Sequence, residues 1–223
     1  MYSVLAHGIA SYRRDVGRDL RSEEPGGIYH VISRGNNRGR LYWDELDRAV
    51  FIERLNRAAR RYDWVGLAYC LMTTHYHLVV QIGEGGLSSG MQELNGEYAR
   101  RANSRHRRVG HLFQNRFFSD WITSDRHLFG AIRYLALNPV RAGICSDPAD
   151  WPWSSHRAAS GLEFPIGYLA LPRLLQLFGT RPAAAQAQYG GLVASGHVSV
   201  SDTGTRTEGD EAKALAFASK VLR

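Results

Sequence analysis

The chain has 223 residues, of which 44% are hydrophobic and 22% are charged. These proportions are typical of a globular protein, and they exclude wholesale disorder. No apolar run is long enough to span a membrane, and the N-terminus lacks the pattern of a secretory signal, so we expect a cytoplasmic protein. Two cysteines are too few for a disulfide framework or a cysteine-based metal cluster.

The formal net charge is +7, and all but two of the 28 basic residues are arginine. Arginine binds phosphate through two parallel N–H donors and stacks on nucleobases, so this bias favours a nucleic-acid partner. A genome rich in G and C produces the same bias, so composition alone leaves both explanations open. The positions of the arginines must decide between them.

Residues 1–24 are polar and rich in arginine, and we expect a basic N-terminal arm there. After Pro25, hydrophobic periodicity predicts alternating strands and helices. The predicted strands span residues 28–32, 64–72, 75–82 and 112–122, and the predicted helices span residues 44–62, 88–103 and 124–137. The last helix is expected to stop at Asn138 because proline disfavours helical conformation in the residue before it.

This β-α-β-β-α-β-α order predicts an α+β fold, with helices packed on a sheet joined by hairpin and helix connections. The segment 161–195 is predicted to form a helical extension, with short helices at 169–178 and 182–194. The tail, residues 196–223, is expected to be flexible with one short helix over 210–222.

A His-x-His motif, His75-Tyr76-His77, lies on the third predicted strand. Residues i and i+2 of a strand share a face, so both imidazoles can chelate one metal ion. Two half-exposed sheet histidines without a metal are the alternative interpretation. The motif by itself leaves both open.

Tyr134 and Asn138 are four residues apart on a predicted helix and therefore lie on one face of it. A phenol and an amide oxygen on one surface can supply a nucleophile and a third metal ligand. A core aromatic residue with a satisfied hydroxyl is the alternative for Tyr134. Tyr98, on another helix beside Arg100 and Arg101, is a rival nucleophile.

Basic and aromatic residues alternate between positions 100 and 118. Arginines for phosphate and aromatic rings for stacking are typical of proteins that bind single-stranded nucleic acid. A solvated helix face explains some of these charges, but Ser104–Arg108 is predicted to lie in a loop. The basic residues are Arg100, Arg101, Arg105, His106, Arg107, Arg108, His111 and Arg116, and the aromatic ones are Phe113, Phe117 and Phe118.

Together these features predict a DNA strand-transfer reaction. A divalent ion held by His75, His77 and Asn138 would polarise a DNA phosphate. Tyr134 would attack the phosphorus and expel a 3′-hydroxyl, leaving a 5′-phosphotyrosine whose energy allows rejoining without ATP.

Five segments in sequence resemble the single-tyrosine HUH transposases, and more narrowly the REP-associated tyrosine transposases of bacteria. The resemblance covers about residues 25–160, which we interpret as the transposase domain. The segments are GIYHVISRGNNRGRLYWDE, AYCLMTTHYHLVVQI, GHLFQNRF, AIRYLALNPVRAGIC and DWPWSSHRA.

The resemblance implies a ferredoxin-like fold and cleavage of single-stranded DNA at imperfect palindromic hairpins. It assigns Mg²⁺ or Mn²⁺ binding to His75 and His77, the nucleophile to Tyr134, and the neighbouring polar position to Asn138. By analogy, further DNA contacts are expected from Arg34, Asn36, Asn37 and Arg116, in addition to Arg105, Arg107 and Arg108. Relatives act as monomers or homodimers, and the sequence leaves that choice open.

One departure from the family pattern is Thr74, where many relatives have asparagine before the first histidine. A strand neighbour faces away from the metal, so we expect Thr74 to have no contact there. Two other function classes compete with the transposase. One is a palindrome-binding protein without cleavage activity. The other is a zinc hydrolase, disfavoured because no carboxylate motif accompanies the histidine pair.

Overall fold

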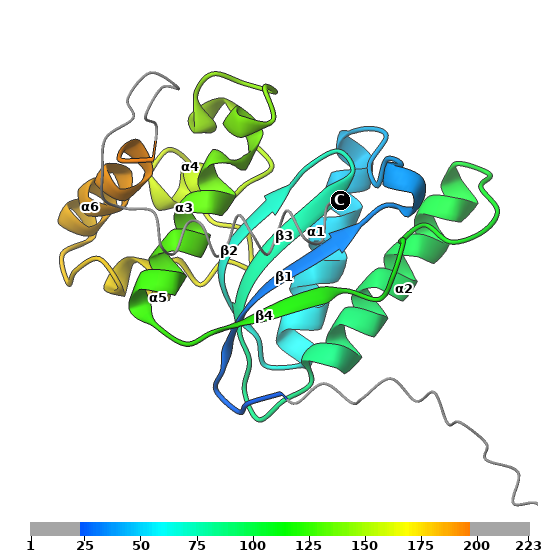
Figure 1. Ribbon diagram of the computed structural model, residues 1–223, viewed down its shortest axis with the longest axis horizontal. Coiled ribbons are helices and arrows are strands. Elements are labelled where there is room, and N and C mark those ends of the chain that lie inside the picture. The colour runs from blue at the N-terminus through cyan, green and yellow to red at the C-terminus, as the bar shows by residue number, and fades with distance from the viewer. Residues whose placement is uncertain (1–22, 197–223) are drawn as a thin grey trace, which may run out of the picture.

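The computed structural model describes residues 23–196, which form helices packed around one four-stranded antiparallel sheet (Figure 1). The strands lie in the order β2-β3-β1-β4, and every neighbouring pair is antiparallel. This is the ferredoxin-like arrangement, so the predicted α+β fold is confirmed. The strands are β1 (Ile28–Arg34), β2 (Val65–Leu71), β3 (His75–Gln81) and β4 (Phe118–Ile122).

Three long helices cover the two faces of the sheet. Helices α1 (Glu45–Arg61) and α2 (Leu87–Arg105) pack on each other behind the sheet in Figure 1, whereas α3 (Asp125–Arg141) packs beside β2 and β3. The side chain of Asp44 accepts a hydrogen bond from the Asp47 amide and caps α1, as the sequence predicts. The shorter elements are η1 (Asn36–Arg38), η2 (Pro148–Asp150), α4 (His156–Ala159), α5 (Leu171–Gln176) and α6 (Pro182–Ala194).

Strand alternation separates an apolar face of the sheet from a histidine-bearing face. Tyr76 points to the α1–α2 side, where its ring lies 4.6 Å from that of Phe51 and its hydroxyl donates to Asn95 Oδ1 at 2.6 Å. His75 and His77, on either side of it in the chain, therefore point to the opposite face. The alternation expected from the sequence thus directs both imidazoles toward α3.

The segment after residue 160 packs on the outer edge of β2. Leu169 pairs with Gly66 in a parallel bridge, and the Tyr168 hydroxyl donates to the Val79 carbonyl at 3.0 Å. A Cβ at position 66 would lie 2.3 Å from the Tyr168 carbonyl oxygen, so this close approach requires glycine. The hydrophobic core therefore continues from the sheet into this segment. Among residues 23–196, no helix is both long and apolar enough to cross a bilayer.

Several predicted boundaries were wrong. The strand expected over 112–122 begins only at Phe118, because the polar run Gln114–Arg116 breaks the alternation. Helix α2 continues through Arg105, and α3 runs through Pro139 to Arg141. Packing against the sheet outweighs the local bias before proline, and the Ala142 amide still closes the helix on the Asn138 carbonyl.

The predictions for the basic arm up to residue 22, and for the tail with its helix at 210–222, lie outside the described residues.

Candidate active site

Four of the predicted site residues meet on the face of the sheet that α3 covers. The ring centroids of His75 and His77 on β3 are 5.0 Å apart, and the centroid of the Tyr134 ring is 5.4 Å from that of His77. The Asn138 amide nitrogen lies 3.4 Å from His77 Nε2. Strand periodicity aligns the two histidines, helix periodicity aligns Tyr134 with Asn138, and the packing of α3 brings the two pairs together within one chain.

Each of the two histidines has its Nδ1 next to a polar neighbour. His75 Nδ1 lies 3.1 Å from Thr74 Oγ1, and His77 Nδ1 lies 3.1 Å from His30 Nε2. His75 Nε2 is buried and makes no hydrogen bond to any residue of the described part of the chain. Thr74 was expected to face away, but it precedes β3, so strand alternation does not govern its direction.

His30 is a member of this cluster that the sequence analysis missed. It lies on β1, is fully buried, and its ring is 5.3 Å from that of His77 and 6.1 Å from that of Tyr134. The strand register explains the contact, because His77 pairs with Ile32, two residues from His30 on the same face. The available signal was a polar residue in the centre of an otherwise apolar strand.

Burial keeps these imidazoles neutral at physiological pH. Desolvation lowers the pKa of His75 to about 4, with the Arg34 charge adding to the effect and Asn138 opposing it. Desolvation also lowers the pKa of His77 well below its usual value. A metal ion needs a neutral imidazole with a free lone pair, so protons compete little for this pair.

The donor set fits one divalent ion held by His75 Nε2, His77 Nε2 and the Asn138 side chain. The Asn138 amide nitrogen, which does not bind cations, lies 3.4 Å from His77 Nε2, so Asn138 would use its Oδ1 as the ligand after rotation of its amide group. The buried His75 Nε2 has no hydrogen-bond partner among the described residues, so its lone pair is available to such an ion. Among the described residues, no three His, Cys, Asp or Glu side chains form a metal-binding group.

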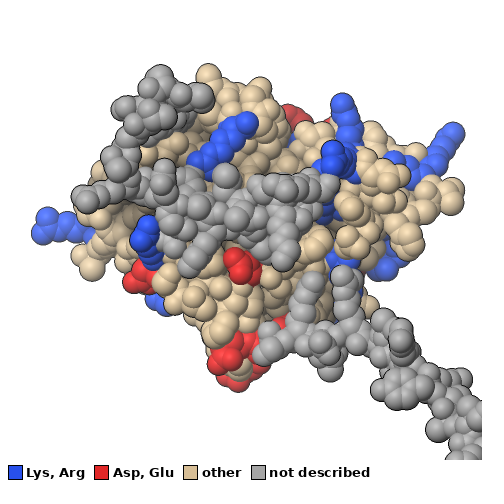
Figure 2. Space-filling view, in the orientation of Figure 1, with Lys and Arg blue, Asp and Glu red and all other residues tan. Residues whose placement is uncertain are grey.

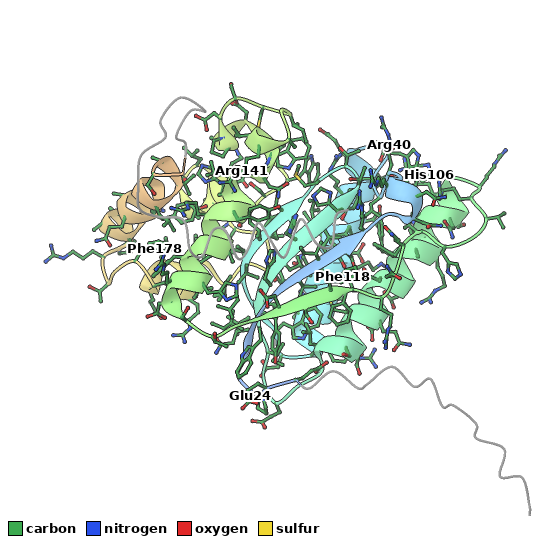
Figure 3. All side chains as sticks on the ribbon, viewed as in Figure 1. Glu24, Arg40, His106, Phe118, Arg141 and Phe178 are labelled. Carbon is green, nitrogen blue, oxygen red and sulfur yellow. The ribbon has the colours of Figure 1, made fainter. Side chains whose placement is uncertain are left out.

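Tyr134 lies at the margin of this cluster with 6% of its surface exposed. Desolvation raises the pKa of its hydroxyl, whereas a hydrogen bond with Asn138 and the charge of Arg141 act in the opposite direction. The Arg141 guanidinium lies 5.5 Å from the centre of the Tyr134 ring, near the upper end of α3 in Figure 3. Because α3 continues past Pro139, positions 134, 138 and 141 share one helix face.

Tyr98, the rival nucleophile, is a core residue. It is 1% exposed, and its hydroxyl donates to the Leu41 carbonyl at 2.6 Å. Its ring packs edge-on against Phe51 on the α1–α2 side of the sheet. Tyr98 therefore lies on the opposite side of the sheet from the two histidines of β3.

Arg105, predicted to lie in a loop, ends helix α2 instead, and its predicted role in DNA binding stays a prediction. Its guanidinium forms ion pairs of 2.6 Å with both Asp44 and Asp47. The hydrogen bond from Arg105 is the main cause that lowers the pKa of Asp44 to about 2, with the Asp47 amide adding to it. Arg105 thus fastens the end of α2 to the start of α1, and its charge is balanced within the protein.

The other predicted arginines of this region are exposed. Arg107 and Arg108 follow α2, and Arg116 lies before β4. The Arg108 guanidinium lies 5.1 Å from the centre of the Trp43 ring. On the face drawn in Figure 2, basic side chains gather at the right-hand end, the end where the loop after α2 lies in Figure 1.

The remaining predicted DNA contacts adjoin the histidine pair. Arg34 pairs with His75 across β1 and β3, and Asn36 and Asn37 are exposed in the turn that follows. A Cβ at Gly35 would lie 2.1 Å from the Gly39 carbonyl oxygen, so the turn is tight enough to require glycine there. These residues therefore lie between the histidine-bearing face of the sheet and the loop at 110–117, which lies beside α2.

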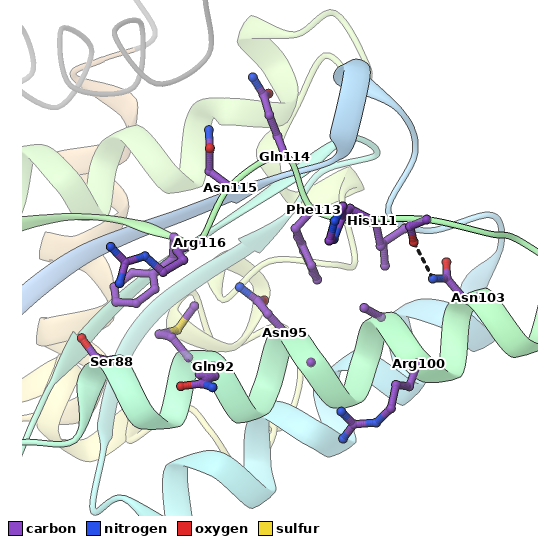
Figure 4. Close-up of a pocket in the computed structure, with 16 residues that line it drawn as sticks. Ser88, Gln92, Asn95, Arg100, Asn103, His111, Phe113, Gln114, Asn115 and Arg116 are labelled. Atoms are coloured by element: carbon purple, nitrogen blue, oxygen red, sulfur yellow. Dashed lines mark hydrogen bonds between the residues drawn. The ribbon is translucent and has the colours of Figure 1, made fainter. Parts of the chain in front are cut away.

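A groove of about 820 Å³ lies between α2 and the loop at 110–117 (Figure 4). The backbone N–H of Gln114 donates to the Arg34 carbonyl, and the backbone N–H of Asn36 donates to the Leu112 carbonyl. The groove therefore begins beside the end of β1. The groove is lined by five amide side chains, by Arg100 and Arg116, and by apolar residues. Its 16 lining residues all lie within the described part of the chain, and none of them is acidic. The five amides are Gln92, Asn95, Asn103, Gln114 and Asn115.

Comparison with known proteins finds a matching family model, a similar sequence and a similar fold. The model of the family "Transposase IS200 like" matches residues 25–135. A putative REP-associated tyrosine transposase of Haemophilus influenzae is 24% identical over 178 residues, which cover 74% of this chain and 97% of the relative. A solved REP-associated tyrosine transposase bound to a REP hairpin has a similar fold, with a TM-score of 0.55 and 22% identity over 68% of this chain and 90% of its own. Over residues 25–135 the chain matches the IS200-like transposase family, and it is similar to the REP-associated tyrosine transposases.

Proposed function

We propose that this protein cleaves and rejoins single-stranded DNA at palindromic hairpins through a covalent link to Tyr134. The observation that carries the proposal is the meeting of Tyr134, Asn138, His75 and His77 on one face of the sheet within one chain. This set combines a nucleophile with ligands for a cation that activates phosphate.

In the proposed step the Tyr134 oxygen forms a bond to phosphorus and the bond from phosphorus to the 3′-oxygen breaks. The phenol loses its proton, the departing 3′-oxygen gains one, and the downstream DNA stays linked to Tyr134 through its 5′-phosphate. Attack by a second 3′-hydroxyl reverses these changes and rejoins DNA. Asn138 and Arg141 assist because both favour the ionised form of Tyr134.

We propose Mg²⁺ or Mn²⁺ as the cation, with His75, His77 and Asn138 as its protein ligands. When bound, the cation supplies charge that polarises the scissile phosphate. Thr74 and His30 orient the two imidazole ligands, since each lies within hydrogen-bonding distance of the Nδ1 of one of them.

For the DNA, we propose a path from the histidine pair past Arg34, Asn36 and Asn37 into the groove beside Arg116. The apolar and amide lining of the groove suits unpaired bases, which stack on apolar surfaces and hydrogen-bond to amides. Arg107 and Arg108 add phosphate contacts at the rim. Hairpin DNA is the proposed substrate because the solved relative of similar fold binds a REP hairpin.

Replacing Arg107 and Arg108 together by alanine should weaken DNA binding roughly tenfold for all sequences. If each arginine neutralises one phosphate, the negative slope of log K against log salt becomes shallower by about 1.4 for single strands. Fluorescence anisotropy with a labelled hairpin over a salt series measures both quantities.

The matched control is the double change Arg173→Ala and Arg181→Ala. It removes the same charge from exposed positions on and beside the extension helices, and affinity should stay within about twofold. Equal losses in the two double variants would mean that net charge alone governs binding.

The proposed function is tested by incubating the protein with a hairpin oligonucleotide carrying single-stranded flanks and Mn²⁺, with EDTA as control. Nicking together with a covalent DNA adduct supports it. Tight hairpin binding without any nicking would instead favour the second candidate, a palindrome-binding protein without cleavage activity.

A further inference from the structure

His30 lies beside the histidine pair, and the proposed reaction does not use it directly. It lies on β1 with no exposed surface, and its Nε2 is 3.1 Å from His77 Nδ1. Asp120 is its partner across β1 and β4, and Asp120 also lies 3.3 Å from His127 Nε2 at the start of α3. Strand pairing and α3 therefore hold His30 in place from several sides.

Both ring nitrogens of His77 have polar neighbours, so the tautomer of His77 determines which nitrogen donates a hydrogen bond and which accepts one. A neutral imidazole has one nitrogen that donates and one that accepts, and His77 presents Nδ1 to His30 and Nε2 to Asn138. A proton on Nδ1 can be donated to the lone pair of His30 Nε2. The lone pair of His77 Nε2 then faces Asn138 and α3, where the proposed cation would sit.

We propose that His30 is a positioning residue that holds His77 in the Nδ1-protonated tautomer and so aims its Nε2 lone pair at the cation. The proposal rests on the proposed function, which makes His77 a metal ligand. Partners of this kind fix the ring orientation and tautomer of metal-binding histidines, and losing one typically weakens metal binding 10- to 100-fold. Thr74 occupies the corresponding place behind His75.

The first measurement uses the metal-free wild-type protein and needs no substitution. The ¹⁵N shifts of the His77 ring report which nitrogen carries the proton, and we expect Nδ1. A His77 ring protonated on Nε2 would overturn the proposal, whatever the protein does to DNA.

The second measurement compares His30→Phe with His30→Gln by titration with Mn²⁺ alone. Phenylalanine fills the space but cannot accept a hydrogen bond, so we expect Mn²⁺ affinity to fall 10- to 100-fold and the His77 tautomers to mix. Glutamine places an acceptor oxygen near the former Nε2 position, so affinity should return to within about threefold of wild type.

His156→Gln is the matched control. His156 is also buried and also has one ring nitrogen, Nδ1, within 3.1 Å of a partner, Tyr189, but it belongs to α4. This variant should change neither Mn²⁺ affinity nor the His77 ring shifts. Equal losses in His156→Gln and His30→Phe would mean that loss of stability, and not positioning, lowers the affinity.

The two proposals fail separately. If the wild type binds no Mn²⁺, the metal part of the proposed function is wrong, whereas the ring shifts still decide whether His30 sets the tautomer. If Mn²⁺ binds and His30→Phe retains full affinity with an unchanged tautomer, the role of His30 is wrong and the proposed function stands.

Discussion

Replacing Tyr134 by phenylalanine is expected to abolish the covalent protein–DNA adduct and to lower hairpin cleavage by at least about 1,000-fold. The ring keeps its packing against His77, so the fold and the site around it remain, and only the attacking oxygen is lost. DNA binding should stay within about twofold of wild type.

The polarity of the adduct gives this test its sharpest form. With wild-type protein, a label on the 3′ end of the oligonucleotide should migrate with the protein on a denaturing gel. A label on the 5′ end should appear in a shorter free fragment that ends in a 3′-hydroxyl. The reverse pattern would exclude a 5′-phosphotyrosine.

Tyr98→Phe is the matched control for this experiment. It removes a hydroxyl that is also buried, at a cost of about 1 kcal/mol in stability for the hydrogen bond to Leu41, but it lies on the other side of the sheet. An adduct that persists in Tyr134→Phe and disappears in Tyr98→Phe would reverse the assignment of the nucleophile.

Removing either histidine of the pair is expected to eliminate metal-dependent cleavage, with a loss of at least about 100-fold for His75→Ala and His77→Ala. EDTA should have the same effect on the wild type. Hairpin affinity should stay within about threefold, because the exposed arginines that we assign to phosphate binding are unchanged.

His75→Ala is the more informative of the two changes because His75 is only partly buried, whereas His77 has no exposed surface and its removal leaves a cavity. Thermal melting identifies any variant that fails to fold, and His156→Ala serves as a buried control away from the site. Wild-type cleavage that continues in EDTA would show that the histidines do not act through a metal.

Much of this site was predictable because each pair of residues lies within one element. Alternation along β3 puts His75 and His77 on one face, and the helical repeat does the same for Tyr134 and Asn138. The fold followed in the same way from the order of elements and their periodicity. These are short-range regularities, and a sequence displays them directly.

The ion pairs of Arg105 could not be predicted from such short-range regularities. Nothing in residues 100–108 indicates that its charge is balanced, because Asp44 and Asp47 precede it by about sixty positions. The end of α3 shows the same limit, since packing on the sheet carries the helix past Pro139 and brings Arg141 to the Tyr134 ring.

The sequence by itself determined which residues share a face within each strand and helix, and with that the histidine pair and the tyrosine–asparagine pair. Only the tertiary structure decided that the two pairs meet, that His30 lies behind His77, and that Arg105 is bound to two aspartates. The physical reason is that periodicity orients side chains within one element, whereas contacts between elements depend on strand register and helix packing. Strand register and helix packing depend on contacts throughout the hydrophobic core, which join residues far apart in the sequence.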